Sequence, residues 1–195
     1  MNDGSNIVGI VLGEKGTGKT PFLIGDEKAG ITGLAEGYLK RDMKMLILDT
    51  YDHPKYRHIP VIQPKQIHYW KKGLYRFFAS DLEEMFVQIK KNLYNCAVGL
   101  EDCHKYLDQY LLENYLNEIN IDSKNRNNDI LYISHAWGWI PKDVYRIADV
   151  FEIFKSSEHP SVRKKELAGC YDRVLKTWEE ALASDDKYFH KTVFK

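Results

Sequence analysis

The sequence predicts an α/β fold, a three-layer sandwich in which helices cover both faces of a mostly parallel central sheet. Two observations predict it. Short, continuously apolar runs, typical of strands buried on both faces, recur along the chain. Between them lie segments whose apolar residues recur at helical spacing. Such alternation favours βαβ units, in which a ligand binds at the carboxyl ends of the strands.

The expected elements follow one another at short intervals. An irregular connection with three prolines is expected over residues 50–72. Strands are expected over residues 6–12, 43–49, 74–78, 96–100, 129–134 and 150–154, with 188–194 as a candidate edge strand. Helices are expected after residue 20 and over residues 81–93, 105–119, 141–147 and 161–183, where Gly169 is a possible break.

The 195 residues suit one domain with a substantial core. We assign residues 1–156 to that core and residues 157–195 to a C-terminal helical extension of the same domain. The three cysteines, Cys96, Cys103 and Cys170, form no paired framework and predict reduced thiols. The sequence begins without the basic and apolar regions of a signal peptide, and no apolar run approaches the ~20 residues that span a bilayer. We therefore expect a cytoplasmic protein without a transmembrane segment.

The formal net charge is zero, with 28 basic and 28 acidic side chains. Overall charge therefore does not indicate a nucleic-acid partner. It does not exclude one either, because a ring that moves along a nucleic acid needs positive charge only along its channel.

A phosphate-binding motif follows the first expected strand and precedes a helix. Its glycines let backbone amides turn inward around an anion, and the helix N-terminus adds partial positive charge. Lys19 would contact the β and γ phosphates, and the Thr20 hydroxyl would bind Mg²⁺. The residues that match GxxxxGK[ST] are Gly13, Glu14, Lys15, Gly16, Thr17, Gly18, Lys19 and Thr20. The motif predicts a P-loop NTPase that binds ATP with Mg²⁺.

Pro21 follows the motif directly. The amide at this position commonly donates to the α-phosphate, and proline has no N–H. We therefore predict that one α-phosphate contact is missing and that binding depends more on the β and γ groups.

A P-loop hydrolase needs an acid near Mg²⁺ and a group that orients water. Glu101 and Asp102 end the apolar strand 96–100 and are similar to a Walker B box with its acids in inverted order. By position, Glu101 would hold the Mg²⁺-bound water, and Asp102 would polarise the attacking water. Asp102 could instead cap the next helix. Asp49 and Asp52, after another strand, are the alternative acids for the metal.

Two further residues are candidates for the reaction. His135, after the strand 129–134, would sense or polarise the γ-phosphate, or else pack locally beside Trp137. Arg126 precedes that strand and would act as an arginine finger on a neighbouring subunit, or else be a solvated loop residue.

The order of these motifs resembles the FtsK–HerA superfamily over about residues 6–156, and within it the viral genome-packaging and zonula-occludens-toxin-like ATPases. In these proteins the strand after Walker B typically ends in a hydroxyl residue and Gln, followed by a turn with Pro and an acidic strand start. Here Ser134, His135, Pro141 and Asp149 stand at those places. The histidine in place of Gln and the inverted acids depart from that pattern.

The resemblance implies a P-loop sheet of the additional-strand type and ATP hydrolysis at the subunit interfaces of a hexameric or similar ring. It also implies DNA that moves through the centre, in a virus or mobile element. Capsid or membrane-associated viral proteins are possible partners. The basic residues Arg163, Lys164 and Lys165 would form a DNA-facing arm or, alternatively, a solvated helix face.

Two other functions stay open at the level of sequence. A small-molecule P-loop kinase or phosphotransferase is one, although the chain has no arginine-rich cluster typical of a lid over the phosphates. A nucleotide-binding scaffold with little turnover is the other, because the acids are arranged unusually.

Overall fold

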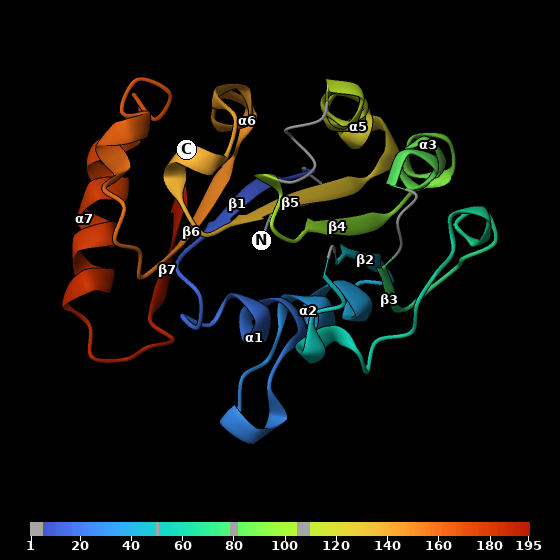
Figure 1. Ribbon diagram of the computed structural model, residues 1–195, viewed down its shortest axis with the longest axis horizontal. Coiled ribbons are helices and arrows are strands. Elements are labelled where there is room, and N and C mark those ends of the chain that lie inside the picture. Colours follow the sequence, from blue (N-terminus) through green and yellow to red (C-terminus); the bar gives the residue numbers. More distant parts are fainter. Residues whose placement is uncertain (1–5, 50, 79–81, 105–109) are drawn as a thin grey trace.

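The computed structural model describes residues 6–49, 51–78, 82–104 and 110–195. Within them, seven strands form one sheet in the order β3-β2-β4-β5-β1-β6-β7, and β7 runs antiparallel to β6 while the other neighbours are parallel (Figure 1). The strands are β1 (Val8–Leu12), β2 (Lys44–Leu48), β3 (Leu74–Phe77), β4 (Cys96–Leu100), β5 (Asn128–Ser134), β6 (Val150–Phe154) and β7 (His190–Phe194).

Helices cover both faces of this sheet. Figure 1 shows α1 (Lys19–Ile24) and α2 (Leu34–Lys40) on one face. The other face carries α3 (Leu82–Asn92), α5 (Tyr110–Arg126) and α6 (Lys142–Ile147). The last helix, α7 (Tyr171–Ala183), packs against β6 and β7. The predicted three-layer α/β fold is therefore confirmed.

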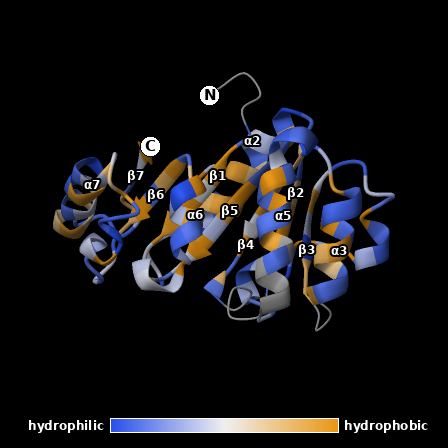
Figure 2. Ribbon diagram, turned by 90° about the horizontal axis from the view of Figure 1, so that it is seen from above, coloured by the Kyte–Doolittle hydropathy of each residue, from blue (hydrophilic) through white to orange (hydrophobic). Residues whose placement is uncertain are grey.

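The sequence pattern explains the two cores. Neighbouring residues of a strand point to opposite faces, so Ile10 and Leu12 pack in one core while Val11 packs in the other. All five residues of β1, β2 and β4 are buried, as continuously apolar strands require. Figure 2 shows these strands as mostly hydrophobic, between helices that alternate hydrophobic and hydrophilic residues.

Two expected helices differ in extent. The expected helix 105–119 corresponds to α5, which continues to Arg126, close to the start of β5. The expected helix 161–183 is divided: a short 3-10 turn spans Pro160–Arg163, and α7 begins only at Tyr171. Residues 81 and 105–109 of the expected helices lie outside the described residues. The segment 157–195 also contains β7, which extends the sheet beyond β6.

The strand order places the site. β5 lies between β4 and β1, so the strand before Glu101 and the strand before the P-loop are separated by one inserted strand. Leu12 pairs with Ser134, and Leu100 pairs with Tyr132, so the three strands end at the same edge. The P-loop, His135 and Glu101 therefore meet at the carboxyl edge of the sheet, as the additional-strand type predicts.

Cys96, Cys103 and Cys170 are free and buried. Burial raises the pKa of the Cys96 and Cys103 thiols, which keeps them protonated at neutral pH. In the described part of the chain, none of the helices has the length and apolar character needed to cross a bilayer.

Candidate nucleotide site

The P-loop is held closely against β5 and β6. Gly13 N–H donates to the Ser134 carbonyl at 3.2 Å, and Glu14 N–H donates to the Lys155 carbonyl at 2.9 Å. A Cβ on Gly13 would lie 2.4 Å from the Phe154 Cβ, so only glycine fits there. Gly16 and Gly18 have φ values of 87° and 108°, a backbone conformation that glycine adopts without strain.

Lys19 lies inside this loop. Its ammonium donates to the Gly13 carbonyl and, at 2.8 Å, to the Glu14 carbonyl, and the residue is only 5% exposed. Burial lowers the pKa of Lys19 to about 8, although the nearby carboxyls of Glu101 and Asp102 act in the opposite direction. The Lys19 ammonium therefore lies inside the phosphate-binding loop and loses its proton at mildly alkaline pH.

His135 connects Lys19 to Asp102. Its Nδ1 lies 3.0 Å from the Lys19 Nζ, and its Nε2 lies 3.1 Å from Asp102 Oδ1. The ring therefore bridges the ammonium and the carboxylate, and its Nδ1 also lies 3.2 Å from the Gly13 carbonyl. Burial opposes ionisation of Asp102, but the hydrogen bond and charge of His135 together lower the pKa of its carboxyl. The structure thus brings three of the predicted site residues into one hydrogen-bonded chain.

Glu101 is held by a residue that the sequence did not indicate. The Tyr56 hydroxyl donates to Glu101 Oε2 at 2.7 Å, and Tyr56 is fully buried. The Thr20 hydroxyl also lies near the Tyr56 oxygen. Burial raises the pKa of Glu101, and the neighbouring Asp102 adds to this, while the Tyr56 hydrogen bond opposes it. No motif around Tyr56 predicts this contact, which joins two residues 45 positions apart in the sequence.

The donor set fits a magnesium ion. The Thr20 and Glu101 oxygens approach one and the same hydroxyl, that of Tyr56, and therefore lie close together beside the P-loop. Mg²⁺ prefers such hard oxygen ligands and keeps several waters when it also binds phosphate. Thr20 and Glu101 are the residues that would hold it here.

The alternative acids, Asp49 and Asp52, both form ion pairs with Arg76. Arg76 donates to Asp49 Oδ2 at 3.0 Å and to Asp52 Oδ1 at 2.7 Å. Asp49 also accepts from the His53 backbone N–H. Since these carboxylates already neutralise a buried guanidinium, the arrangement favours Glu101 as the acid on the metal side. In the described ranges, no group of three or more His, Cys, Asp or Glu side chains could hold a metal by itself.

Arg126 lies at the opposite, amino edge of the sheet, at the end of α5. Its side chain packs over the Tyr94 ring, donates to the Lys91 carbonyl at 3.2 Å and pairs loosely with Asp122. The structure therefore does not bring Arg126 to the P-loop of its own chain. Whether it reaches the nucleotide of a neighbouring subunit stays a prediction, as does the effect of Pro21.

The basic residues 163–165 also have local roles. Arg163 donates to the Gly138 carbonyl at 2.7 Å and to the Ile140 carbonyl at 3.0 Å. The Lys164 ammonium lies over the Tyr171 ring. They belong to the 3-10 turn and the segment after it, not to a continuous helix face.

An aromatic surface flanks the other side of the P-loop. A Cβ on Gly18 would lie 2.8 Å from the Tyr188 ring, so this ring rests on the loop. Beyond it, the His190 and Phe154 rings stack at 4.7 Å, and Phe22 meets both edge-on. Sequence reasoning missed this surface because Tyr188 and His190 come from the far end of the chain.

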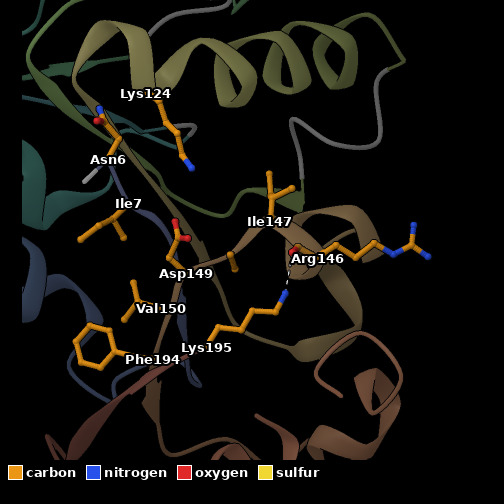
Figure 3. Close-up of a pocket in the computed structure, with 10 residues that line it drawn as sticks. Asn6, Ile7, Lys124, Arg146, Ile147, Asp149, Val150, Phe194 and Lys195 are labelled. Atoms are coloured by element: carbon orange, nitrogen blue, oxygen red, sulfur yellow. Dashed lines mark hydrogen bonds between the residues drawn. The ribbon is translucent and has the colours of Figure 1, made fainter. Parts of the chain in front are cut away.

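A large cavity of about 870 Å³ lies elsewhere, at the amino edge of the sheet (Figure 3). Figure 3 shows Asp149, Val150 and Phe194 along it, and the Lys195 ammonium donates to the Arg146 carbonyl at 2.7 Å. In-line phosphoryl transfer needs the acceptor beside the γ-phosphate. Because the P-loop is at the carboxyl edge, this cavity is not placed to hold the acceptor of a phosphotransferase.

The pKa of Lys19 predicts a pH dependence of nucleotide affinity. The charged ammonium binds phosphate, and bound phosphate raises its pKa, so binding takes up a proton above pH 8. We expect the affinity for Mg·ADP to be constant between about pH 7 and 8 and then to fall up to about tenfold per pH unit. Calorimetric titrations in buffers of different ionisation enthalpy measure both effects. Lys19→Arg, which stays charged, should show neither the proton uptake nor the fall in affinity. If the affinity of the wild-type protein stayed unchanged up to pH 9.5, Lys19 would not be the group that binds the phosphates as a cation.

Together the fold and the motif define an α/β protein of the P-loop NTPase type with an inserted strand. No protein-family model matches the sequence, and no curated protein matches it. Solved structures do match. The genome-packaging NTPase B204 of Sulfolobus turreted icosahedral virus 2, in complex with ATP-γS, superimposes with a TM-score of 0.66 at 12% identity over 97% of this chain and 92% of that one.

Two further structures are similar. B204, the DNA-packaging ATPase of Sulfolobus turreted icosahedral virus, has a TM-score of 0.63 at 12% identity, over 100% of this chain and 98% of that chain. The pCW3 conjugation coupling protein TcpA, with ATPγS, has a TM-score of 0.56 at 11% identity, over 80% of this chain and 51% of that one. At these identities the likeness shows the shared fold.

Proposed function

We propose that this chain is an ATP hydrolase that uses the energy of hydrolysis to move DNA, in the packaging or export of a viral or phage genome. The observation that carries this proposal is the convergence of Lys19, His135–Asp102 and Glu101 at the end of an inserted strand. The fold that this chain shares with the genome-packaging NTPase B204 supports the same conclusion.

Different parts of the site bind the triphosphate, the nucleobase and the magnesium ion. Backbone amides of the P-loop and the Lys19 ammonium hold the triphosphate, and the nucleobase packs on the aromatic surface beside Gly18 and Tyr188. Mg²⁺, held by Thr20 and Glu101, would neutralise charge that develops on the β and γ phosphates. Glu101 stays oriented because Tyr56 donates to it.

Asp102 and His135 act on the attacking water. The His135 ring fixes the Asp102 carboxylate, and the lowered pKa of this carboxyl keeps it ionised, so that it can accept a hydrogen bond from the attacking water and polarise it. When Lys19 turns toward bound phosphate, it leaves the Nδ1 of His135, which can donate to the γ-phosphate once the ring carries a proton on both nitrogens. In this way the pair can orient the water and report that the γ-phosphate is present.

We also propose that the protein works as a homo-oligomeric ring, in which Arg126 acts on the nucleotide of a neighbouring subunit. Capsid or membrane-associated viral proteins are the partners such a motor would have. The mass of the assembly, measured by light scattering with and without ATP analogue and DNA, tests this part. We expect a ring of several subunits with both ligands, and a protein that stays monomeric under every condition would contradict the motor.

Tyr56→Phe should lower turnover and leave nucleotide binding intact. The ring still fills its buried site, but Glu101 loses the donor that orients it, and partners of this kind typically contribute about 10-fold to 100-fold. We expect kcat for ATP to fall about 10-fold with KM changed less than about threefold. Tyr75→Phe, at a half-buried ring distant from Glu101 in the described contacts, is the matched control. An unchanged kcat in Tyr56→Phe would remove Tyr56 from the mechanism.

A further inference from the structure

The connection between β2 and β3 concentrates positive charge in a chain whose formal net charge is zero. Residues 53–73, called here the basic strap, contain five lysine and arginine residues and no acid, although the whole chain has 28 of each charge. All five are exposed. They are Lys55, Arg57, Lys65, Lys71 and Lys72.

The basic strap is a fixed element. Buried side chains alternate with the exposed cations and anchor it to the two cores. Its backbone pairs with the edge of the sheet, where Ile62 N–H donates to the Arg76 carbonyl at 2.8 Å and Arg76 N–H donates to the Pro60 carbonyl at 2.9 Å. In Figure 1 this teal segment runs along the outer side of β3. The buried anchors are Tyr56, Ile59, Ile62, Ile67 and Trp70.

The positive charge of the strap is only partly neutralised by acidic side chains of the same chain. Asp52, the acid just before it, pairs with Arg76 at 2.7 Å and with Arg57 at 3.0 Å. Across the ranges that the structure describes, Lys65, Lys71 and Lys72 form no ion pair. Beside them, the Tyr69 ring is 76% exposed. Unpaired cations next to an exposed aromatic ring are typical of a surface that binds a nucleic-acid backbone.

The strap also touches the hydrolysis site. Tyr56 lies between the exposed Lys55 and Arg57 in sequence, and its hydroxyl is the group that holds Glu101. A ligand that binds these two cations would therefore act on the backbone that positions the Tyr56 hydroxyl. This path connects an outer basic surface to the acid on the metal side through a single residue.

We propose that the basic strap is a surface that binds the phosphate backbone of DNA, and that Tyr56 transmits this contact to Glu101 so that bound DNA stimulates ATP turnover. This inference rests on the proposed function, because it names the part of the chain through which the motor would contact its substrate. A membrane surface also attracts cations, but the link to Glu101 favours a ligand whose binding must control hydrolysis.

The test compares two triple variants of the full chain with the same change of charge. Lys65→Gln/Lys71→Gln/Lys72→Gln neutralises the strap, and Lys164→Gln/Lys165→Gln/Lys176→Gln neutralises exposed lysines near α7. Binding of a fluorescent DNA duplex is followed by anisotropy over a range of salt concentrations. We expect the strap variant to bind at least about tenfold more weakly and its salt dependence to fall by about three units of slope. The α7 variant should bind as wild type does.

Turnover completes the test. Basal ATP hydrolysis should be unchanged in both triple variants, and stimulation by DNA should be lost only in the strap variant. Tyr56→Phe should bind the duplex with wild-type affinity but respond to it weakly or not at all. Loss of stimulation together with retained binding in Tyr56→Phe would support the transmission from the strap to Glu101.

The outcomes separate this inference from the proposed function. A wild-type protein that neither binds the duplex nor responds to it would overturn both. A wild-type protein that binds the duplex and is stimulated by it, while the strap variant behaves identically, would overturn the inference alone. The inference would also be overturned if the strap variant lost affinity for phosphatidylglycerol vesicles and kept its affinity for DNA.

Discussion

Glu101→Gln should abolish most ATP hydrolysis while the nucleotide still binds. The amide keeps the size of the carboxyl and can still accept the Tyr56 hydrogen bond, but it loses the negative charge on the metal side. We expect turnover to fall about 100-fold or more, with the affinity for ATP analogue within about threefold of wild type. Steady-state phosphate release and calorimetric titration with a non-hydrolysable analogue measure the two quantities.

The same variant has a second readout. Glu101 is buried, and burial raises the pKa of its carboxyl, so removal of the charge relieves a desolvation cost. The midpoint of urea unfolding should therefore not fall, which excludes misfolding as the cause of lost turnover. Glu83→Gln, at an exposed acid of α3, is the matched control and should leave turnover unchanged. Wild-type turnover in Glu101→Gln would exclude Glu101 from the mechanism.

Lys19→Ala should instead abolish binding. The ammonium lies inside the P-loop and is the buried cation closest to where phosphate would bind. Hydrogen bonds to charged groups contribute about 1.5–3 kcal/mol each, so loss of this one should weaken ATP binding about 10-fold to 150-fold. Titration with a fluorescent nucleotide measures the change.

Lys15→Ala is the control for Lys19→Ala. Lys15 belongs to the same loop, but its side chain is exposed, and we expect it to bind the phosphates through its backbone N–H. Its replacement should change affinity less than about threefold, which is under 1 kcal/mol. If Lys15→Ala weakened binding as much as Lys19→Ala, general positive charge would explain binding better than the specific position of Lys19.

Local pattern was enough to predict most of the fold. The apolar runs before Gly13 and Glu101 identify buried strands because few other segments of this length are apolar throughout. The P-loop motif then indicates which edge of the sheet holds the ligand. The predicted proximity of Lys19, His135 and Glu101 follows from that single edge, and the structure brings all three together.

Contacts between distant segments could not be predicted in the same way. Tyr56 meets Glu101, and Tyr188 meets Gly18, only because the chain folds an irregular connection and its last strand back onto the site. Neither tyrosine stands in a motif or a periodic pattern. The same limit applies to Asp49, whose pairing with Arg76 depends on the packing of β3 beside β2.

The measurement that tests the central claim most directly is the rate of ATP hydrolysis by the wild-type protein with and without duplex DNA, at protein concentrations where it assembles. We expect Mg²⁺-dependent turnover that rises several-fold when DNA is added, and a rise that disappears in Glu101→Gln. The same turnover with and without DNA at every salt concentration would contradict a DNA-moving ATPase.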